Sequence, residues 1–292
     1  MARLPLELIP CLVLGVLSGM VLPWLPARLA PILIRWGVPL SLAALLLRSE
    51  LSLTLVRVGL LGLLVPLACL LLLGLPPLRD GLRHRVLWLG AAVGNTGYWG
   101  LPVALALLPP RALATVVAYD LAGTLITWSV GPLLLRGGRR GGGSVLPLVA
   151  SSPALHGVAL FALLAHTPWR PVLAQALWWP ARLVLLVALT LMGMRLGLCL
   201  KDRTLAFSPG VPWALVFKLL VVPALVWGLA GLLRLPPLDR QALVLQGAAP
   251  TALSVLLLAE VEGVEASLAS TLVLVSTVSA LVTVPLWWRL IH

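Results

Sequence analysis

Two short polar stretches interrupt otherwise apolar runs and carry the side chains best suited to hold a small ligand. The first is GNTGYWGLP at residues 94–102, and the second is QGAAPT at residues 246–251. Their amide, hydroxyl and phenol groups can donate hydrogen bonds to a polar ligand or accept them from it. The residues that we predict to form a substrate site are Asn95, Thr96, Tyr98, Pro102, Gln246, Pro250 and Thr251.

The prolines of these stretches add backbone groups to the site. Pro102 cannot donate to the carbonyl of Tyr98. Pro250 frees the carbonyl of Gln246 in the same way. We expect half-helix N-termini just after each proline to attract an anion, and carbonyl ends near Asn95 and Gln246 to suit a cation or a donor. A packing kink explains either break alone, but two breaks at equivalent positions favour a site.

One carboxylate, Asp120, lies well inside an apolar run. A charged group is costly to bury there, so Asp120 is a functional candidate, and Thr124 shares its helix face. We predict that they bind a coupling proton or sodium ion; the alternative is a structural ion pair or a position nearer the surface. An offset of 147 residues places Ser267 and Thr271 at the corresponding positions of the second half.

Two basic residues near apolar runs, Arg182 and Lys218, have two readings. Each side chain either lines a substrate pathway or extends its charged end to the lipid headgroups. The sequence leaves both readings open.

No residue pattern indicates catalysis, a metal or a cofactor. The four histidines and three cysteines are scattered, and the sequence contains no paired carboxylates, HExxH motif or nucleophile elbow. It also contains no phosphate-binding loop. We therefore expect neither an enzyme nor an ATP-driven pump. The net charge of +12 comes mostly from arginines at the ends of apolar runs, which predicts membrane topology and not nucleic-acid binding.

The elements that must position these residues are membrane helices. Of the 292 residues, 61% are hydrophobic and 10% are charged, and the mean hydropathy is +1.08, too apolar for the surface of a soluble domain. We predict an all-α integral membrane protein, since about 20 apolar residues make one crossing. The ten expected spans lie at about residues 6–23, 30–47, 55–75, 86–108, 112–135, 145–166, 172–197, 211–233, 239–260 and 266–289.

The two halves of the chain show matching features. Arg35 and Arg182 are 147 residues apart in the second and seventh spans, and Pro102 and Pro250 are 148 apart in the fourth and ninth. Because each half has five spans, the second half enters the membrane with opposite polarity, which is an inverted-topology repeat. The predicted repeats occupy residues 1–140 and 141–292, with a glycine- and arginine-rich link at 137–143.

Basic clusters predict the orientation. The ten-span layout brings three of them to one side, opposite both termini: Arg79/Arg83/Arg85, Arg136/Arg139/Arg140 and Arg195/Lys201/Arg203. That side is cytoplasmic by the positive-inside rule. We therefore predict a multi-pass protein of the cell membrane with both termini outside the cytoplasm.

The two proline segments also resemble a known family. GNTGYWGLPVAL resembles the first crossover motif of the auxin efflux carrier family of transporters, and QGAAPTALSVLLLAE with STLVLVSTVSALVTVPL resembles its last two helices. The resemblance carries over the family positions Asn95, Pro102 and Pro250. The short midpoint link departs from the plant members and favours a prokaryotic-type member.

The resemblance implies both a fold and a substrate class. The fold is two inverted five-helix repeats, with spans 1, 2, 6 and 7 as a scaffold and the others as a mobile domain in which broken helices 4 and 9 cross. The substrates are small organic anions, such as indole acetate in plants and dicarboxylates in bacteria.

These observations predict a secondary transporter for a small organic anion that works by alternating access in a lipid bilayer. A homodimer is compatible with the sequence. The alternative is a channel or a non-transporting membrane sensor on the same fold. A channel needs a continuous polar path, whereas polar residues here gather mainly at mid-membrane.

Overall fold

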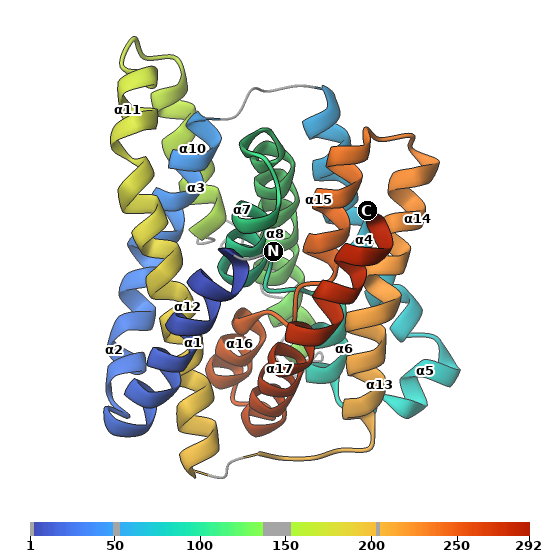
Figure 1. Cartoon of the computed structure of the whole chain (residues 1–292). Coiled ribbons are helices and arrows are strands. Elements are labelled where there is room, and N and C mark those ends of the chain that lie inside the picture. The colour runs from blue at the N-terminus through green and yellow to red at the C-terminus, as the bar shows by residue number, and fades with distance from the viewer. Residues whose placement is uncertain (1–2, 49–52, 137–152, 203–204) are drawn as a thin grey trace.

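The computed structural model describes residues 3–48, 53–136, 153–202 and 205–292. The predicted glycine-rich link, the boundary between the two predicted repeats, and Arg139, Arg140 and Arg203 lie outside these ranges. Within the described ranges every regular element is a helix (Figure 1). The all-helical class predicted from the sequence is therefore confirmed.

Helices occur in all ten ranges where spans are expected. In chain order they are α1 (Arg3–Val21), α2 (Leu25–Ile32), η1 (Leu33–Gly37), α3 (Val38–Leu47), α4 (Leu53–Leu73), α5 (Pro76–Gly81), α6 (Arg85–Ala92), η2 (Thr96–Gly100), α7 (Leu101–Leu107), η3 (Pro110–Ala112), α8 (Leu113–Arg136), α10 (Pro153–Ala165), α11 (Arg170–Ala176), α12 (Trp178–Asp202), α13 (Gly210–Val216), η4 (Phe217–Val221), α14 (Val222–Leu232), α15 (Pro237–Gly247), α16 (Leu253–Glu262) and α17 (Ala266–Ile291).

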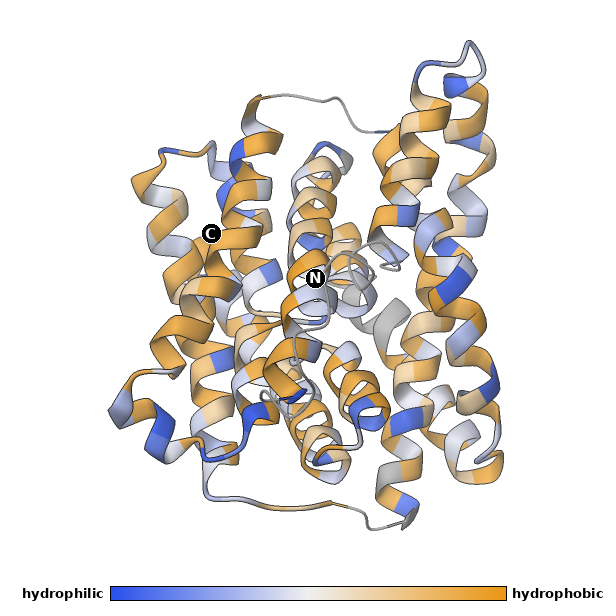
Figure 2. Ribbon diagram, turned by 180° about the vertical axis from the view of Figure 1, so that it is seen from behind, coloured by the Kyte–Doolittle hydropathy of each residue, from blue (hydrophilic) through white to orange (hydrophobic). Residues whose placement is uncertain are grey.

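Six helical segments in the described ranges are long and apolar enough to cross a membrane. They are Leu25–Leu47, Leu53–Leu73, Leu113–Arg136, Arg170–Leu198, Gly210–Leu232 and Ala266–Ile291. Of the other four expected spans, the first and sixth have shorter apolar helices, Ile9–Val21 and Leu155–Ala165, and the fourth and ninth are interrupted. Figure 2 shows apolar residues along the helices and many of the hydrophilic ones at the turns. The chain is a multi-pass membrane protein.

The helices form two groups side by side. The outer group consists of α1, α2, η1, α3, α10, α11 and α12, and α1 packs on α12 while α3 packs on α10 and α12. The crossover group consists of the remaining helices, with α4 packed on α8 and α14 on α15. In Figure 1 most of the outer group stands on the left, and α7, α8 and α16 lie between it and the rest of the crossover group.

Glycines let α1 and α12 approach backbone to backbone. A Cβ atom added to Gly15 would lie 2.8 Å from the Cα atom of Gly193, closer than real Cβ contacts. Small residues at such crossings are typical of membrane helix packing, where dispersion contacts take the place of the hydrophobic effect. This crossing fixes the first helix onto the outer group.

Three π-helical segments each end two residues before a proline. η1 precedes Pro39, η2 precedes Pro102, and η4 precedes Pro223. Proline lacks an N–H group and its ring crowds the preceding turn, so a widened turn accommodates it without ending the helix. Pro102 therefore lies inside a continuous helix, which moves the break in the fourth span elsewhere.

Candidate functional site

The fourth expected span breaks seven residues before the proline that was expected to break it. α6 ends at Ala92, Val93 has an extended backbone, and helical structure resumes at Thr96. The expected N-terminal end just after Pro102 is thus wrong in position, because it lies at Thr96. The reason is the π segment, which absorbs Pro102 within the helix. The carboxyl end of the first half-helix, Ala92, lies near Asn95 as predicted.

The ninth span breaks around its proline, as predicted. α15 ends at Gly247 and α16 begins at Leu253, with Pro250 between them. The carbonyl of Gln246 is not free, because the N–H of Ala249 donates to it at 3.2 Å. The residue that ends the first half-helix is Gly247.

The two breaks cross and bond to each other. Gly94 and Thr251 form an isolated antiparallel bridge. On either side of it, the N–H of Asn95 donates to the carbonyl of Pro250 at 2.7 Å, and the N–H of Ala252 donates to that of Val93 at 3.3 Å. Two of the N–H groups and two of the carbonyls at the breaks are therefore satisfied within the protein, as a membrane interior requires.

Thr251 links the second break to two helices at this crossing. Its hydroxyl donates to the carbonyl of Gly90 in α6 at 2.9 Å, and its N–H donates to the hydroxyl of Ser276 in α17 at 3.1 Å. All three residues are buried. Thr251 thus has a structural part at the crossing.

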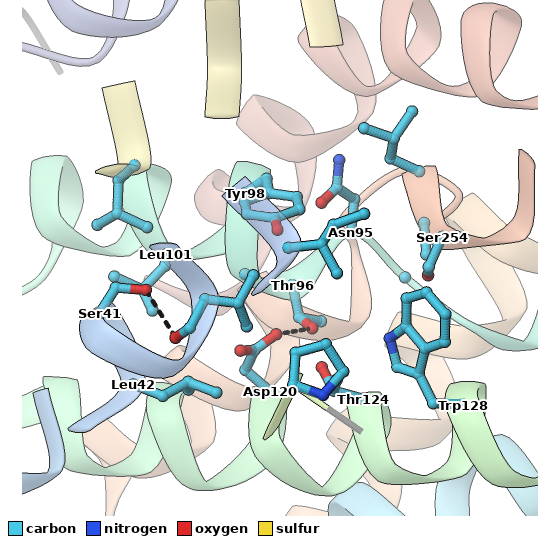
Figure 3. A pocket seen from close by; sticks show the side chains of 18 of the residues that line it. Ser41, Leu42, Asn95, Thr96, Tyr98, Leu101, Asp120, Thr124, Trp128 and Ser254 are labelled. Atoms are coloured by element: carbon cyan, nitrogen blue, oxygen red, sulfur yellow. Dashed lines mark hydrogen bonds between the residues drawn. The ribbon is translucent and has the colours of Figure 1, made fainter. Parts of the chain in front are cut away.

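A cavity of about 80 Å³ lies between the outer group and the crossing (Figure 3). Its lining from the outer group includes Ser41 of α3 and Leu185 of α12. Its lining from the crossover group is Gly94, Asn95, Thr96, Gly97, Tyr98, Leu101, Asp120, Thr124, Trp128, Ala252, Leu253, Ser254 and Leu257. Both second half-helices, beginning at Thr96 and Leu253, start at this cavity. We refer to it as the crossover cavity.

Asp120 lies at the N-terminus of the helix that begins at Thr96. The Thr96 hydroxyl donates to its Oδ1 at 2.5 Å, and Figure 3 shows the two side chains pointing toward each other. A Cβ atom on Gly97 would lie 3.1 Å from the same oxygen, so the carboxylate contacts the backbone of the first turn. The side chain is 6% exposed. A helix N-terminus stabilises negative charge, so this end holds the carboxylate of the protein itself.

A second, smaller cavity of about 10 Å³ lies on the other side of the 94–96 segment. Its polar lining includes Thr96, Tyr119, Lys218 and Gln246. The amide of Gln246 is fully buried, and neither its nitrogen nor its oxygen has a hydrogen-bond partner among the described residues. A space of this size holds about one water molecule.

The predicted site residues thus fall into four places. Asn95, Thr96, Tyr98, Asp120 and Thr124 line the crossover cavity, and Gln246 lines the second cavity. Pro102, Pro250 and Thr251 are buried beside the crossing. Ser267 is exposed, and Thr271 is buried with its hydroxyl bonded to the N–H of Ala206 and the carbonyl of Ser267, so neither lines either cavity.

The offset of 147 residues is the reason that the last pair was misplaced. The half-helix ends Ala92 and Gly247 are 155 residues apart, and the starts Thr96 and Leu253 are 157 apart. An intermediate offset of 156 brings Asp120 to Ser276, which bonds the backbone of the second break as Asp120 contacts the first. The two breaks are therefore 155 to 157 residues apart, and not 147.

Three polar lining residues escaped prediction. Trp128 follows Asp120 and Thr124 on one helix face, so the i+4 spacing could have identified it. Ser254 lies just after the second break. Ser41 comes from the outer group, and the sequence offers no signal that Ser41 lines the cavity. Within the described ranges, no group of three or more His, Cys, Asp or Glu residues could hold a metal ion.

The sequence left the roles of Arg182 and Lys218 open, and the structure places the two residues differently. The Arg182 guanidinium lies 5.8 Å from the ring centre of Trp179, and Arg182 is not among the residues that line either cavity. Lys218 is 1% exposed and lines the second cavity. Only Lys218 therefore lies at the crossing.

The site thus consists of two broken helices that cross inside an apolar multi-helix protein. A cavity with a few polar groups in an apolar lining lies beside them, at the boundary of the two helix groups. Broken helices of this kind occur in secondary transporters. Residues 181–288 match the family model described as membrane transport protein. That stretch contains the second break and most of α17.

Two archaeal proteins named uncharacterized transporters are relatives of the chain. The protein from Methanocaldococcus jannaschii is 27% identical over 206 residues, covering 68% of this chain and 66% of its own length, just under two thirds. The protein from Methanothermobacter thermautotrophicus is 26% identical over 215 residues, covering 72% and 70%. The chain is therefore similar to membrane transport proteins, in agreement with the resemblance to the auxin efflux carrier family that its two proline segments show.

Proposed function

We propose that the protein carries a small organic anion across the cell membrane by alternating access around the crossed breaks. The observation that carries this proposal is the crossover cavity, at which the two second half-helices begin at Thr96 and Leu253. The first N–H groups of a helix have no acceptor within it and bear partial positive charge. Two such ends at one cavity favour an anionic ligand.

Neighbouring polar side chains would orient the anion. Asn95 and Tyr98 extend from the first break, and Ser254 follows the second. Their amide and hydroxyl groups can donate to a carboxylate, while Leu101 and Leu257 provide apolar contact for the rest of a small organic acid. This mixture of a few polar groups with an apolar lining is typical of small-molecule sites.

Asp120 supplies the coupling in this proposal. Its carboxylate contacts the helix end at Thr96 and Gly97, where a bound anion would also lie. Two negative charges at one buried site repel each other strongly. Protonation of Asp120 removes that repulsion, so we propose that a proton accompanies the anion; a sodium ion at Asp120 is the alternative that the experiment below distinguishes.

Alternating access needs two bodies that move against each other, and the cavity lies where they would meet. α1 packs on α12 and α3 on α10, so the first and second spans of each half pack reciprocally. This reciprocal packing supports the proposed ten-span inverted repeat, with the outer group as scaffold. Arg136 and Arg195 both pair with glutamates next to the α16–α17 turn, which we propose faces the cytoplasm, with the termini outside.

Uptake into proteoliposomes tests the proposal. We expect the purified protein to take up labelled short mono- or dicarboxylates with saturation, and Asn95→Ala and Asp120→Ala to abolish most of that uptake. Thr127→Ala is the matched control, because its hydroxyl bonds to the carbonyl of Gly123 in the same helix and does not line the cavity. Unchanged uptake in both site variants would remove the assignment, and non-saturating flux would indicate a channel.

The coupling ion is tested with Asp120→Asn, which imitates the neutral acid. We expect this variant still to bind the anion in a thermal-shift assay, and its uptake to lose its response to a pH gradient. Uptake of the wild type that follows a sodium gradient and ignores the pH gradient would contradict proton coupling.

A further inference from the structure

Lys218 is a cation buried at the crossing of the two broken helices. It belongs to the π segment η4, and only 1% of the residue is exposed. Burial of an ammonium group costs several kcal/mol unless other groups compensate its charge. Within the described ranges no carboxylate forms an ion pair with Lys218. The compensating groups must therefore be uncharged.

The carboxyl end of a broken helix provides the compensation. The Lys218 Nζ donates to the carbonyl of Gly247 at 2.8 Å, and Gly247 is the last residue of α15. The last carbonyls of a helix lack intrahelical donors and together bear about half a negative charge. The ammonium therefore caps the half-helix that ends at the second break.

The same ammonium also contacts the first break. A Cβ atom on Gly94 would lie 3.0 Å from the Lys218 Nζ, so the group sits against the extended segment of the fourth span. The unpartnered amide of Gln246 lines the same small cavity. Lys218 is thus positioned between the two breaks, next to a carbonyl oxygen that could bind a cation.

In secondary transporters with broken helices, the carboxyl ends of half-helices and unwound carbonyls hold the coupling cation. We infer that Lys218 is a built-in replacement for such an ion: its tethered ammonium occupies the cation position at the end of α15, so the crossing needs no soluble sodium there. This inference rests on the proposed function for its role in transport, but the occupancy itself can be measured without a substrate.

Thermal unfolding of the purified full chain tests the occupancy. We expect the Tm of the wild type to be the same in sodium chloride and in choline chloride. Lys218→Ala opens space beside the Gly247 carbonyl, so its Tm should rise by about 2–4 °C in sodium or methylammonium chloride relative to choline chloride, which corresponds to roughly 1 kcal/mol of binding. Lys218→Met fills that space without a charge and should show no rise.

Two results of the unfolding experiment would contradict the inference. A sodium-dependent rise in the wild type that persists in Asp120→Asn, or no response of Lys218→Ala to either cation, overturns the inference. Should Lys218→Ala fail to fold, the volume-matched Lys218→Met variant decides: we expect at least about tenfold lower carboxylate uptake than the wild type, equivalent to about 1.4 kcal/mol, and unchanged uptake overturns the inference. If the wild type transports no carboxylate, the proposed function fails, while the unfolding measurements still test Lys218.

Discussion

The backbone N–H of Asn95 donates to the carbonyl of Pro250 across 2.7 Å, and this bond joins two helix breaks that are far apart in the sequence. It lies directly beside the Gly94–Thr251 bridge. The crossing is therefore a small piece of two-stranded backbone pairing inside a helical protein, and it holds both half-helix starts at one cavity.

Asn95→Pro isolates the contribution of this bond. Asn95 has φ −78°, which proline can adopt, but proline has no N–H to donate to Pro250. We expect Asn95→Pro to be less stable than Asn95→Ala by about 1–3 kcal/mol, because the buried Pro250 carbonyl loses its donor. Chemical or thermal unfolding measures the difference. Equal stability of the two variants would show that the bond is dispensable.

Pro102→Ala should leave the crossing intact. The break lies at residues 93–95 and is held by bonds to residues 250–252, while Pro102 lies inside the following helix. We expect uptake to persist, with a loss of about 0.4–1 kcal/mol in stability from the greater freedom of the unfolded chain. A loss of uptake in a folded Pro102→Ala variant would restore the proline itself as the functional feature.

Gly15→Ala should destabilise the outer group. The added methyl would overlap the backbone of α12 at Gly193, and neither backbone can yield without separating the helices. Overpacking of this kind costs about 1–3 kcal/mol. Gly123→Ala is the control, since a Cβ there has nothing within 4 Å and alanine favours the helix. The comparison is made by thermal unfolding, and a Gly15→Ala variant as stable as Gly123→Ala would contradict the packing argument.

Two ion pairs at the α16–α17 turn should differ in function. Arg195 of α12 pairs with Glu260 at 3.0 Å and so links the outer group to the crossover group. Arg136 of α8 pairs with Glu262 at 2.8 Å, and both residues belong to the crossover group. Under the proposed alternating access one group moves against the other, so only the first pair would have to break during transport.

We therefore expect Glu260→Gln to change the maximal uptake rate by about two- to fivefold. A partly exposed ion pair contributes up to about 1 kcal/mol, and its loss can change a rate by no more than this. Glu262→Gln should lower stability and leave the rate unchanged. Initial uptake rates and unfolding curves of the two variants provide the comparison. An equal effect of both substitutions on the rate would argue against relative motion of the two groups.

The sequence alone determined the class of protein and the location of its two unusual segments. A composition with 61% hydrophobic and 10% charged residues permits only a membrane helical protein, and glycine, proline and amides inside apolar runs indicate broken helices. These are local properties, because membrane burial and helix breaking depend on residue type and near neighbours.

Only the tertiary structure decided where the first helix breaks and which residues meet there. Thr96 rather than Pro102 begins the second half-helix, Ser276 rather than Thr271 serves the second break, and Lys218 reaches the end of α15. Each of these depends on hydrogen bonds between segments that lie 25 or more residues apart, or on a π segment that absorbs a proline. Neither leaves a periodic trace in the sequence, because the partner that completes the bond comes from another helix.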